Sequence, residues 1–308
     1  MGIYIYCLIG TPVTFPSTMT GIDGVHAVEV EERDGIFAVL SHVPLTEYNE
    51  EALEKNITDV AWLAPRAKRH EEIIEFVMTH TLSNQNEEVP FFMHKEKGGE
   101  GEKGRECVRR IPLAPQWGEI KEVVGKCYTP VVPLRFCTLY KNREGLFKAV
   151  MPHKEKIHNF LDYTADKTEW AVKVFCDKTV FLNKHDKNKE QSQEAKQTSL
   201  LPGEAYLLAK KTLREREERF GADLQTYLKD IDCALSQYAD HRRFLHCTGK
   251  RVHGRPLDMV MNTACLVEQQ TFTLFKDTLD ILAEKYKDEG VVFEMSGPWP
   301  PYNFCPEL

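Results

Sequence analysis

The sequence predicts an α+β protein of two domains: a small N-terminal α+β domain and a C-terminal ferredoxin-like domain with the order β-α-β-β-α-β. Short apolar runs such as Ile3–Ile9 and Trp170–Cys176 have the length and patterning of strands. Apolar residues over 60–78 recur at three- and four-residue steps, as in a helix. A chain of 308 residues with 42% hydrophobic residues can form two cores, for which we expect residues 1–140 and 141–308.

The N-terminal domain is predicted from four segments. Ile3–Ile9 reads as a strand with Tyr4 and Tyr6 on one face. Strands over 25–30 and 36–40 flank Asp34-Gly35, a typical hairpin turn. The helical pattern over 60–78 contains Pro65, which we expect in the first turn of a second helix. Val131–Phe136 is predicted as the returning strand.

The second domain is predicted to begin with a connecting helix that Asn142 caps and Pro152 kinks. The longest helical pattern covers Glu204–Tyr238, so either Gly221 bends this helix or one end projects beyond the sheet. The other expected elements are strands at 170–176, 244–247, 257–267 and 291–293 and a helix over 269–287. In a ferredoxin-like order the first and third strands are central and the last is an edge.

Two polar segments interrupt these patterns, at about 83–118 and about 183–199. Residues 95–110 alternate Lys, Glu, Gly and Arg with few apolar side chains, a composition that cannot bury enough area to order itself. We therefore expect a mobile loop there, which trypsin should cut first.

Composition argues against several classes of function. A net charge of −7 and a pI near 5.9 disfavour nucleic acid as the main partner. No apolar run approaches the roughly 20 residues that span a bilayer, so we expect no membrane insertion. Nine scattered cysteines without a CxxC pair suit a reducing compartment, and the N-terminus reads as a strand rather than a signal peptide. These features predict a cytoplasmic protein.

A rigid aromatic corner follows the last predicted strand. Pro298, Trp299, Pro300, Pro301 and Tyr302 combine three prolines with two aromatic side chains, and Ser296-Gly297 and Pro298 are expected to end the strand. Two interpretations stay open. The aromatic residues either close one end of the core or form a surface that binds a partner protein.

The sequence indicates no catalytic or cofactor site. His241, His246, Cys247 and His253 fall within 13 residues but lack the spacing of a zinc site, so we expect no metal. His70 lies on the apolar side of its helix, as a core histidine would, and Arg135 interrupts an apolar strand, where an ion pair with a carboxylate is expected. Nucleotide-binding and hydrolase motifs are absent from the sequence.

Six motifs in order resemble the gas vesicle protein F/L family. They are Gly-Ile-Tyr-Ile-Tyr-Cys-Leu-Ile at the N-terminus, Trp62-Leu63 with His70-Glu71, Pro-Leu-Arg135-Phe136, Glu169-Trp170-Ala-Val-Lys173-Val, Pro202-Gly-Glu-Ala-Tyr206-Leu207, and the C-terminal Gly-Pro-Trp299-Pro-Pro-Tyr302-Asn-Phe. Asn262 also fits. The two polar insertions depart from the family, as does Cys137, where a Gly is common. F-type and L-type membership both stay open.

The resemblance implies an accessory or minor structural protein of gas vesicles, the hollow protein-walled flotation organelles of some prokaryotes. It implies binding of the small hydrophobic shell subunit of the GvpA type, with other accessory proteins as further partners, a role in vesicle assembly, no enzymatic activity and a modified ferredoxin-like C-terminal half. Two rivals are an enzyme that uses His70 and Arg135, and a regulatory module that binds a small molecule on the sheet. A deep polar pocket would favour the first, and an apolar cavity with convergent polar groups the second.

Overall fold

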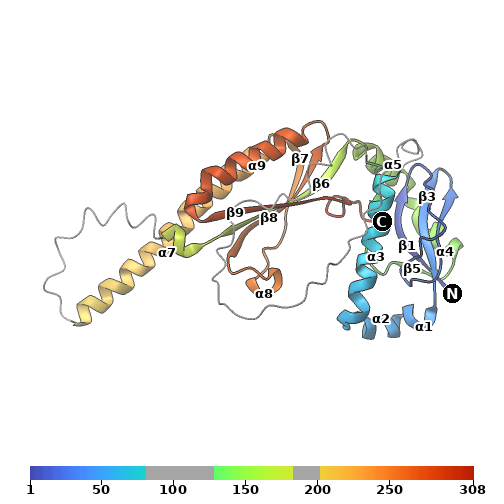
Figure 1. The fold of residues 1–308 in the computed structure, drawn as a ribbon, viewed down its shortest axis with the longest axis horizontal. Coiled ribbons are helices and arrows are strands. Elements are labelled where there is room, and N and C mark those ends of the chain that lie inside the picture. The colour runs from blue at the N-terminus through green and yellow to red at the C-terminus, as the bar shows by residue number, and fades with distance from the viewer. Residues whose placement is uncertain (81–127, 183–201) are drawn as a thin grey trace, which may run out of the picture.

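A computed structural model describes residues 1–80, 128–182 and 202–308. The chain forms two β-sheets in an elongated molecule, the first at one end and the second near the middle, and helix α3 lies on the side of the first sheet that faces the second (Figure 1). We call the parts around these sheets the N-terminal half and the C-terminal half. Among the described helices, none is both long and apolar enough to cross a membrane.

The first sheet is antiparallel, with the order β2-β3-β1-β4 and β5 also paired with β1. Its strands are β1 (Gly2–Ile9), β2 (Val28–Arg33), β3 (Ile36–Val43), β4 (Val132–Pro133) and β5 (Leu139–Tyr140). The predicted hairpin turn is confirmed: Asp34 and Gly35 both have positive φ angles, 52° and 80°. All eight residues of β1 are buried, so this strand is the centre of the half.

Helices cover both faces of the first sheet. Tyr4 and Tyr6 of β1 face α3 (Val60–Thr79), while Ile3 and Ile5 face α4 (Arg143–Val150) and α5 (Lys154–Tyr163). The side chain of Asn142 accepts a hydrogen bond from the backbone N–H of Gly145 and so caps α4, and a 3₁₀ turn (Met151–His153) separates α4 from α5 at the predicted kink. The helix expected to connect two domains thus packs on the first sheet, and the domain boundary itself stays a prediction.

Pro65 lies inside α3, not in the first turn of a second helix as predicted. Two short helices, α1 (Leu45–Tyr48) and α2 (Glu50–Asn56), precede α3 instead. Proline at this position removes a hydrogen bond to the carbonyl group one turn earlier, but Pro65 is exposed. The buried residues Ile73, Ile74 and Val77 further along α3 stabilise the helix enough to tolerate that loss.

The returning strand is shorter than predicted. It was expected over Val131–Phe136, but the ladder ends at Pro133, because proline has no N–H to continue it. The N–H of Leu134 still donates to the carbonyl oxygen of Tyr6 over 2.8 Å, and Cys137, with a φ of 64°, turns the chain back toward β5.

The second sheet contains β6 (Lys167–Cys176), β7 (Ala239–Phe244), β8 (Asp258–Glu268) and β9 (Val291–Trp299). It is antiparallel with the order β7-β8-β6-β9, so β6 and β8 are central. Helices α7 (Pro202–Leu235) and α9 (Phe272–Tyr286) pack on the face that carries Trp170, Val172 and Val174. The described residues of this half also include the short helices α8 (Lys250–His253) and η4 (Lys287–Glu289).

Two expectations for the second sheet need correction. The strand expected at 244–247 lies earlier, at Ala239–Phe244, where it pairs with β8. The last strand does not end at Ser296-Gly297: after a shift in register it pairs Trp299 with Glu169. Gly297 permits this path. Its φ is 139°, and a β-carbon at this position would lie only 2.9 Å from the Glu169 carbonyl oxygen, so a residue with a side chain would be strained there.

Helix α7 projects beyond the sheet, one of the two outcomes predicted for it (Figure 1). Its C-terminal part packs against the core through Ile231 and Leu235, whereas Tyr206, Leu207 and Leu213 are exposed. The two polar insertions, with the loop expected at 95–110, lie outside the described residues.

Candidate interaction site

The C-terminal segment turns back from the second sheet onto the first. Residues 300–305, which we call the C-terminal strap, follow β9 directly and contact both halves of the molecule. Of the five residues proposed from the sequence, Pro298 and Trp299 end β9, and Pro300, Pro301 and Tyr302 begin the strap. The structure separates them: Trp299 is exposed, Pro298 is half-buried, and Pro300 and Pro301 are buried.

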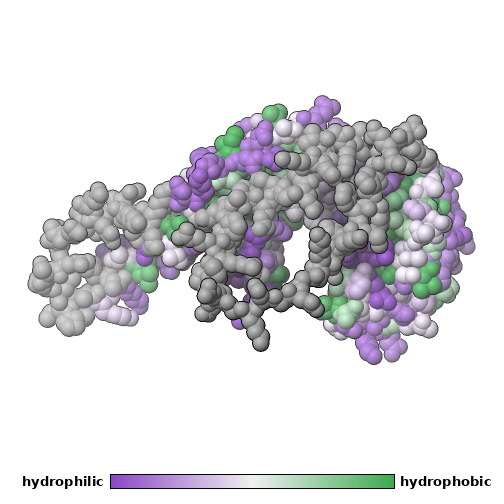
Figure 2. Space-filling view, in the orientation of Figure 1, coloured by the Kyte–Doolittle hydropathy of each residue, from purple (hydrophilic) through white to green (hydrophobic). Residues whose placement is uncertain are grey.

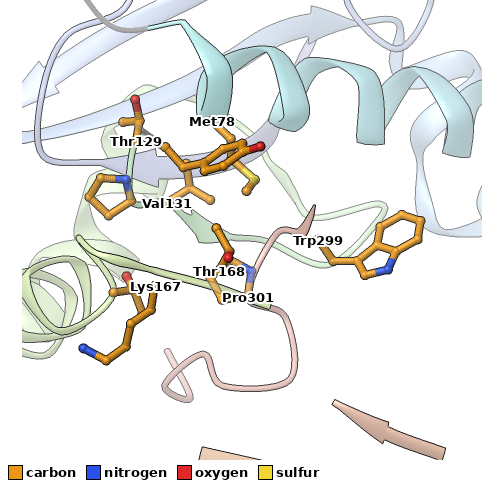
Figure 3. Close-up of a pocket in the computed structure, with 10 residues that line it drawn as sticks. Met78, Thr129, Val131, Lys167, Thr168, Trp299 and Pro301 are labelled. Carbon is orange, nitrogen blue, oxygen red and sulfur yellow. The ribbon is translucent and has the colours of Figure 1, made fainter. Parts of the chain in front are cut away.

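Trp299 lies at the end of an edge strand with 37% of its surface exposed. Its indole Nε1 donates a hydrogen bond to Ser296 Oγ at 3.1 Å, which fixes the ring against its own strand. Figure 3 shows the ring directed away from the other labelled residues of a small hollow at the junction of the two halves. That hollow is lined by Met78, Tyr128, Thr129, Pro130, Val131, Thr164, Lys167, Thr168, Trp299 and Pro301.

Tyr302 points into the N-terminal half and reaches His70. Its hydroxyl lies 3.1 Å from His70 Nε2 and 3.1 Å from Glu71 Oε1. On the other side of the ring, His70 Nδ1 lies 2.8 Å from the Tyr4 hydroxyl. The strap residue is therefore joined to the central strand β1 through a histidine of α3.

The neighbours of His70 determine where the protons of this network lie. Tyr4 Oη accepts from the N–H of Cys137 at 3.1 Å, so its own proton is free to be donated to His70 Nδ1. Nε2 then carries the ring proton and donates it to the carbonyl oxygen of Leu134 at 3.2 Å and to Tyr302 Oη. Tyr302 in turn donates to Glu71. Each of these donors and acceptors is used.

His70 is neutral in this arrangement. Only 1% of its surface is exposed, and burial lowers its pKa to about 4. Burial, and next the Glu71 carboxylate, raise the pKa of Tyr302 above its usual range, so the tyrosine also stays protonated. Because both of its ring nitrogens form hydrogen bonds, His70 has a structural role. Among the described residues, His70 is buried whereas Arg135 is exposed beyond the end of β4.

Asn303 connects the strap to the second sheet. Its backbone N–H donates to Glu169 Oε2 at 3.0 Å, and its side-chain Nδ2 donates to Oε1 of the same carboxyl at 2.5 Å. Glu169 is only 3% exposed, and burial raises its pKa to about 7, against the lowering effect of the Asn303 hydrogen bonds and of Arg243. Next along the strap, Phe304 and Cys305 pack against the core shared by β1, α4 and α5.

Arg135 does not form the expected ion pair. It lies beyond the end of β4 with its side chain exposed, and no carboxylate in the described part of the chain pairs with it. Its carbonyl oxygen accepts hydrogen bonds from the N–H and the hydroxyl of Thr138. Across the described ranges, no three His, Cys, Asp or Glu side chains come together as a metal site would require, and this includes the histidines at 241, 246 and 253.

Sequence reasoning did not identify Glu169, Asn303 or Tyr4 as parts of this junction. Glu169 carries a signal, because a carboxylate directly before an apolar run within a strand needs a partner if it is buried. Tyr4 and Asn303 carry none, because their partners lie 66 and 134 residues away in the chain.

The chain is similar to known proteins over most of its length. The chain is 23% identical over 291 residues to gas vesicle protein L from a Streptomyces species, covering 92% of this chain and 86% of that protein. It is 21% identical over 317 residues to gas vesicle protein L1 from Halobacterium salinarum, covering 100% and 91%. The crystal structure of gas vesicle protein GvpF from an Anabaena species superposes with a TM-score of 0.62 and 16% identity, covering 100% and 97%.

The family model for gas vesicle synthesis protein GvpL/GvpF matches residues 2–82 and 118–306, which together include both sheets, α3, α7 and the C-terminal strap. The chain therefore belongs to the GvpL/GvpF family of gas vesicle proteins.

Proposed function

We propose that this protein binds the small hydrophobic shell subunit of gas vesicles and supports vesicle assembly as an accessory or minor structural component. Membership of the GvpL/GvpF family, which gives the chain a gas vesicle-related role, supports the proposal most strongly. On this proposal the protein acts by binding and not by catalysis, in the cytoplasm and at the gas vesicle. Other gas vesicle accessory proteins would be further partners.

The physical argument concerns the solubility of the shell subunit. A wall that keeps water out of a gas space must present an apolar surface, and such a surface aggregates unless a partner covers it before assembly. A folded protein with an acidic net charge and an accessible aromatic anchor at a sheet edge suits this task. We further infer that the C-terminal half is ferredoxin-like, which the strand order β7-β8-β6-β9 supports.

Trp299, with Pro298 beside it, is the part of the proline-rich corner that we propose as a contact for the shell subunit. Pro300, Pro301 and Tyr302 turn inward, so their role in binding would be to hold Trp299 at the edge of β9. A tryptophan that a partner buries completely commonly contributes about 2 kcal/mol or more to binding.

The test compares Trp299→Ala with Ile281→Ala. Ile281 is an exposed apolar residue on α9. The part of the surface over α9 that is visible in Figure 2 is mostly hydrophilic. We expect Trp299→Ala to weaken binding of purified shell subunit by about 2 kcal/mol, or roughly thirtyfold, with little change in Tm. Ile281→Ala should change neither. A loss of about 3 kcal/mol in folding stability by Trp299→Ala, with binding reduced only in proportion, would instead identify a core residue.

The assembly role is tested in the host. Deletion of the gene should reduce the number of vesicles or distort their shape, and the wild-type gene should restore them. Normal vesicles in the deletion strain, together with no contact between the purified protein and the shell subunit, would overturn the proposal.

A further inference from the structure

A basic segment stands out in this acidic protein. Residues 241–255 contain five Arg or Lys and no Asp or Glu, whereas the whole chain has a net charge of −7. The segment forms most of β7, the loop after it and α8, which lies on the lower side of the second sheet in Figure 1. Arg242, Lys250 and Arg255 are paired with Asp232, Asp258 and Glu294.

Arg251 has no such partner. It is exposed, and no carboxylate in the described ranges forms an ion pair with it. The next residue, Val252, is 76% exposed, the highest value among the large hydrophobic side chains of the described residues. We call Lys250, Arg251 and Val252 the α8 surface. It combines an exposed apolar side chain with an uncompensated positive charge.

The N-terminal half carries a surface of the opposite sign. Glu50, Glu51 and Glu54 of α2 are exposed, and within the described part of the chain none of them is paired with a base. Beside them Ile57 is 44% exposed and Val60 is 73% exposed. We call these five residues the α2 surface. It too combines apolar side chains with uncompensated charges, here negative.

We propose that two copies of this chain associate through these surfaces, with the α2 surface of each copy packed on the α8 surface of the other. Figure 1 shows α2 and α8 on the same side of an elongated molecule, one in each half. A two-fold axis perpendicular to the long axis then brings both pairs together at once. The contact is isologous and closes as a dimer, without leading to open fibres.

Apolar contact and charge have different roles in this dimer. Covering Val252, Val60 and Ile57 supplies much of the attraction, because burying these side chains removes apolar area from water. The charges mainly set orientation and partner choice, since exposed ion pairs contribute little energy. The association should therefore be weak, stronger at low salt, and sensitive to reversal of either charge.

Sedimentation velocity over roughly a hundredfold range of concentration tests the dimer. At low salt the average mass should rise from that of one 35.5 kDa chain toward twice that value, and raising the salt should reduce the rise. Arg251→Glu and Glu54→Lys should each raise the dimer dissociation constant at least tenfold. Both sites are exposed and the second substitution places a lysine near a helix C-terminus, so folding should be unaffected.

Mixing the two variants distinguishes this geometry from other dimers. In a mixed pair, the glutamate introduced at position 251 of one copy would meet the lysine introduced at position 54 of the other, while the second contact keeps its original Arg251 and Glu54. The mixture should therefore associate as well as wild type, although each variant alone does not. Lys229→Glu, an equal charge change at an exposed site on α7, should leave the dimer intact.

Three results would overturn the proposal. One is a chain that stays monomeric at all concentrations in low salt. Another is a dimer that is indifferent to both reversals, and the third is a mixture no better than its separate components. Shell-subunit binding by the same variants provides an independent readout, because Trp299 belongs to neither surface.

Discussion

Glu169, near the start of β6, is hydrogen-bonded to Asn303 of the C-terminal strap and so connects the beginning and the end of the C-terminal half. Its carboxyl accepts two hydrogen bonds from Asn303 and lies near Arg243, yet burial dominates and raises its pKa from 4.5 to about 7. The folded state therefore holds its proton more tightly than the unfolded chain. The stabilisation from the protonated carboxyl is complete below pH 4.5 and is lost as the pH rises through about 7.

We predict that Glu169→Gln stabilises the fold at neutral and higher pH. The amide has a similar shape, stays uncharged and can keep an oxygen toward the Asn303 N–H, while the Asn303 amide turns over to accept. The gain in free energy of unfolding should be about 3 kcal/mol at pH 8 and should vanish near pH 4.5. Denaturant unfolding at a series of pH values measures it, with Glu284→Gln on the exposed part of α9 as control. A gain independent of pH would contradict this explanation.

For a single residue such as His70, the sequence predicted that the side chain is buried but not which residues it contacts. His70 was expected in a core, and it lies buried on the Tyr4 side of β1. The hydrogen bond to Tyr302 links positions 232 residues apart, and no local pattern encodes such a distance. Arg135 looked half-buried only because the strand around it was expected to continue to Phe136. The backbone leaves the sheet at Pro133, so Arg135 faces solvent.

Among the elements, α3 and β9 show what proline does and does not decide. Both Pro65 and Pro298 were expected to mark boundaries, and both lie inside an element. A proline removes about one hydrogen bond from a helix or strand that continues past it. Packing of a buried helix face, or pairing with a central strand, can offset that loss. Long periodic elements such as α3, α7 and α9 were predictable, because their apolar stripes reflect the core on which they pack. The ends of the elements depended on contacts made elsewhere.

We predict that Pro65→Ala stabilises α3. Alanine restores an N–H that can donate to the carbonyl oxygen of Ala61, and it has a much higher helix propensity. Proline stiffens the unfolded chain, which offsets part of the gain, so the net effect should be about 1 kcal/mol and a few degrees in Tm. Thermal unfolding followed by circular dichroism measures this. An unchanged or lower Tm would mean that α3 is already adapted to the proline.

At the scale of the whole molecule, the C-terminal strap contacts both halves. Each sheet has its own core, so neither depends on the other for burial of its central strands. Tyr302 packs on the α3 side of the first sheet, Phe304 and Cys305 on the α4–α5 side, and Asn303 holds β6 of the second sheet. The strap therefore passes around the edge of the first sheet near β4, where Cys305 Sγ lies 3.8 Å from the Pro133 carbonyl oxygen.

We predict that replacing both Tyr302 and Phe304 by alanine loosens the halves without unfolding either. Removing either side chain removes an aromatic contact with the N-terminal half, and removing Tyr302 also breaks its hydrogen bond to His70. Because both side chains are only partly buried, about 2 kcal/mol for each is expected, less than for a full core deletion. Small-angle scattering should fit one arrangement for wild type and a broader range of distances between the halves for the variant.

The Trp299→Ala variant provides the matched control for this experiment, because it removes an aromatic residue of the same segment that does not enter the N-terminal half. Its scattering profile should match that of wild type. If the double variant also scatters like wild type while its far-ultraviolet circular dichroism is unchanged, contacts other than the strap hold the halves together. If both sheets unfold in one transition at a much lower temperature, the strap belongs to a shared core. The prediction holds only if the halves of the double variant take up a range of distances while both sheets stay folded. That result would show that the strap joins two halves that fold independently.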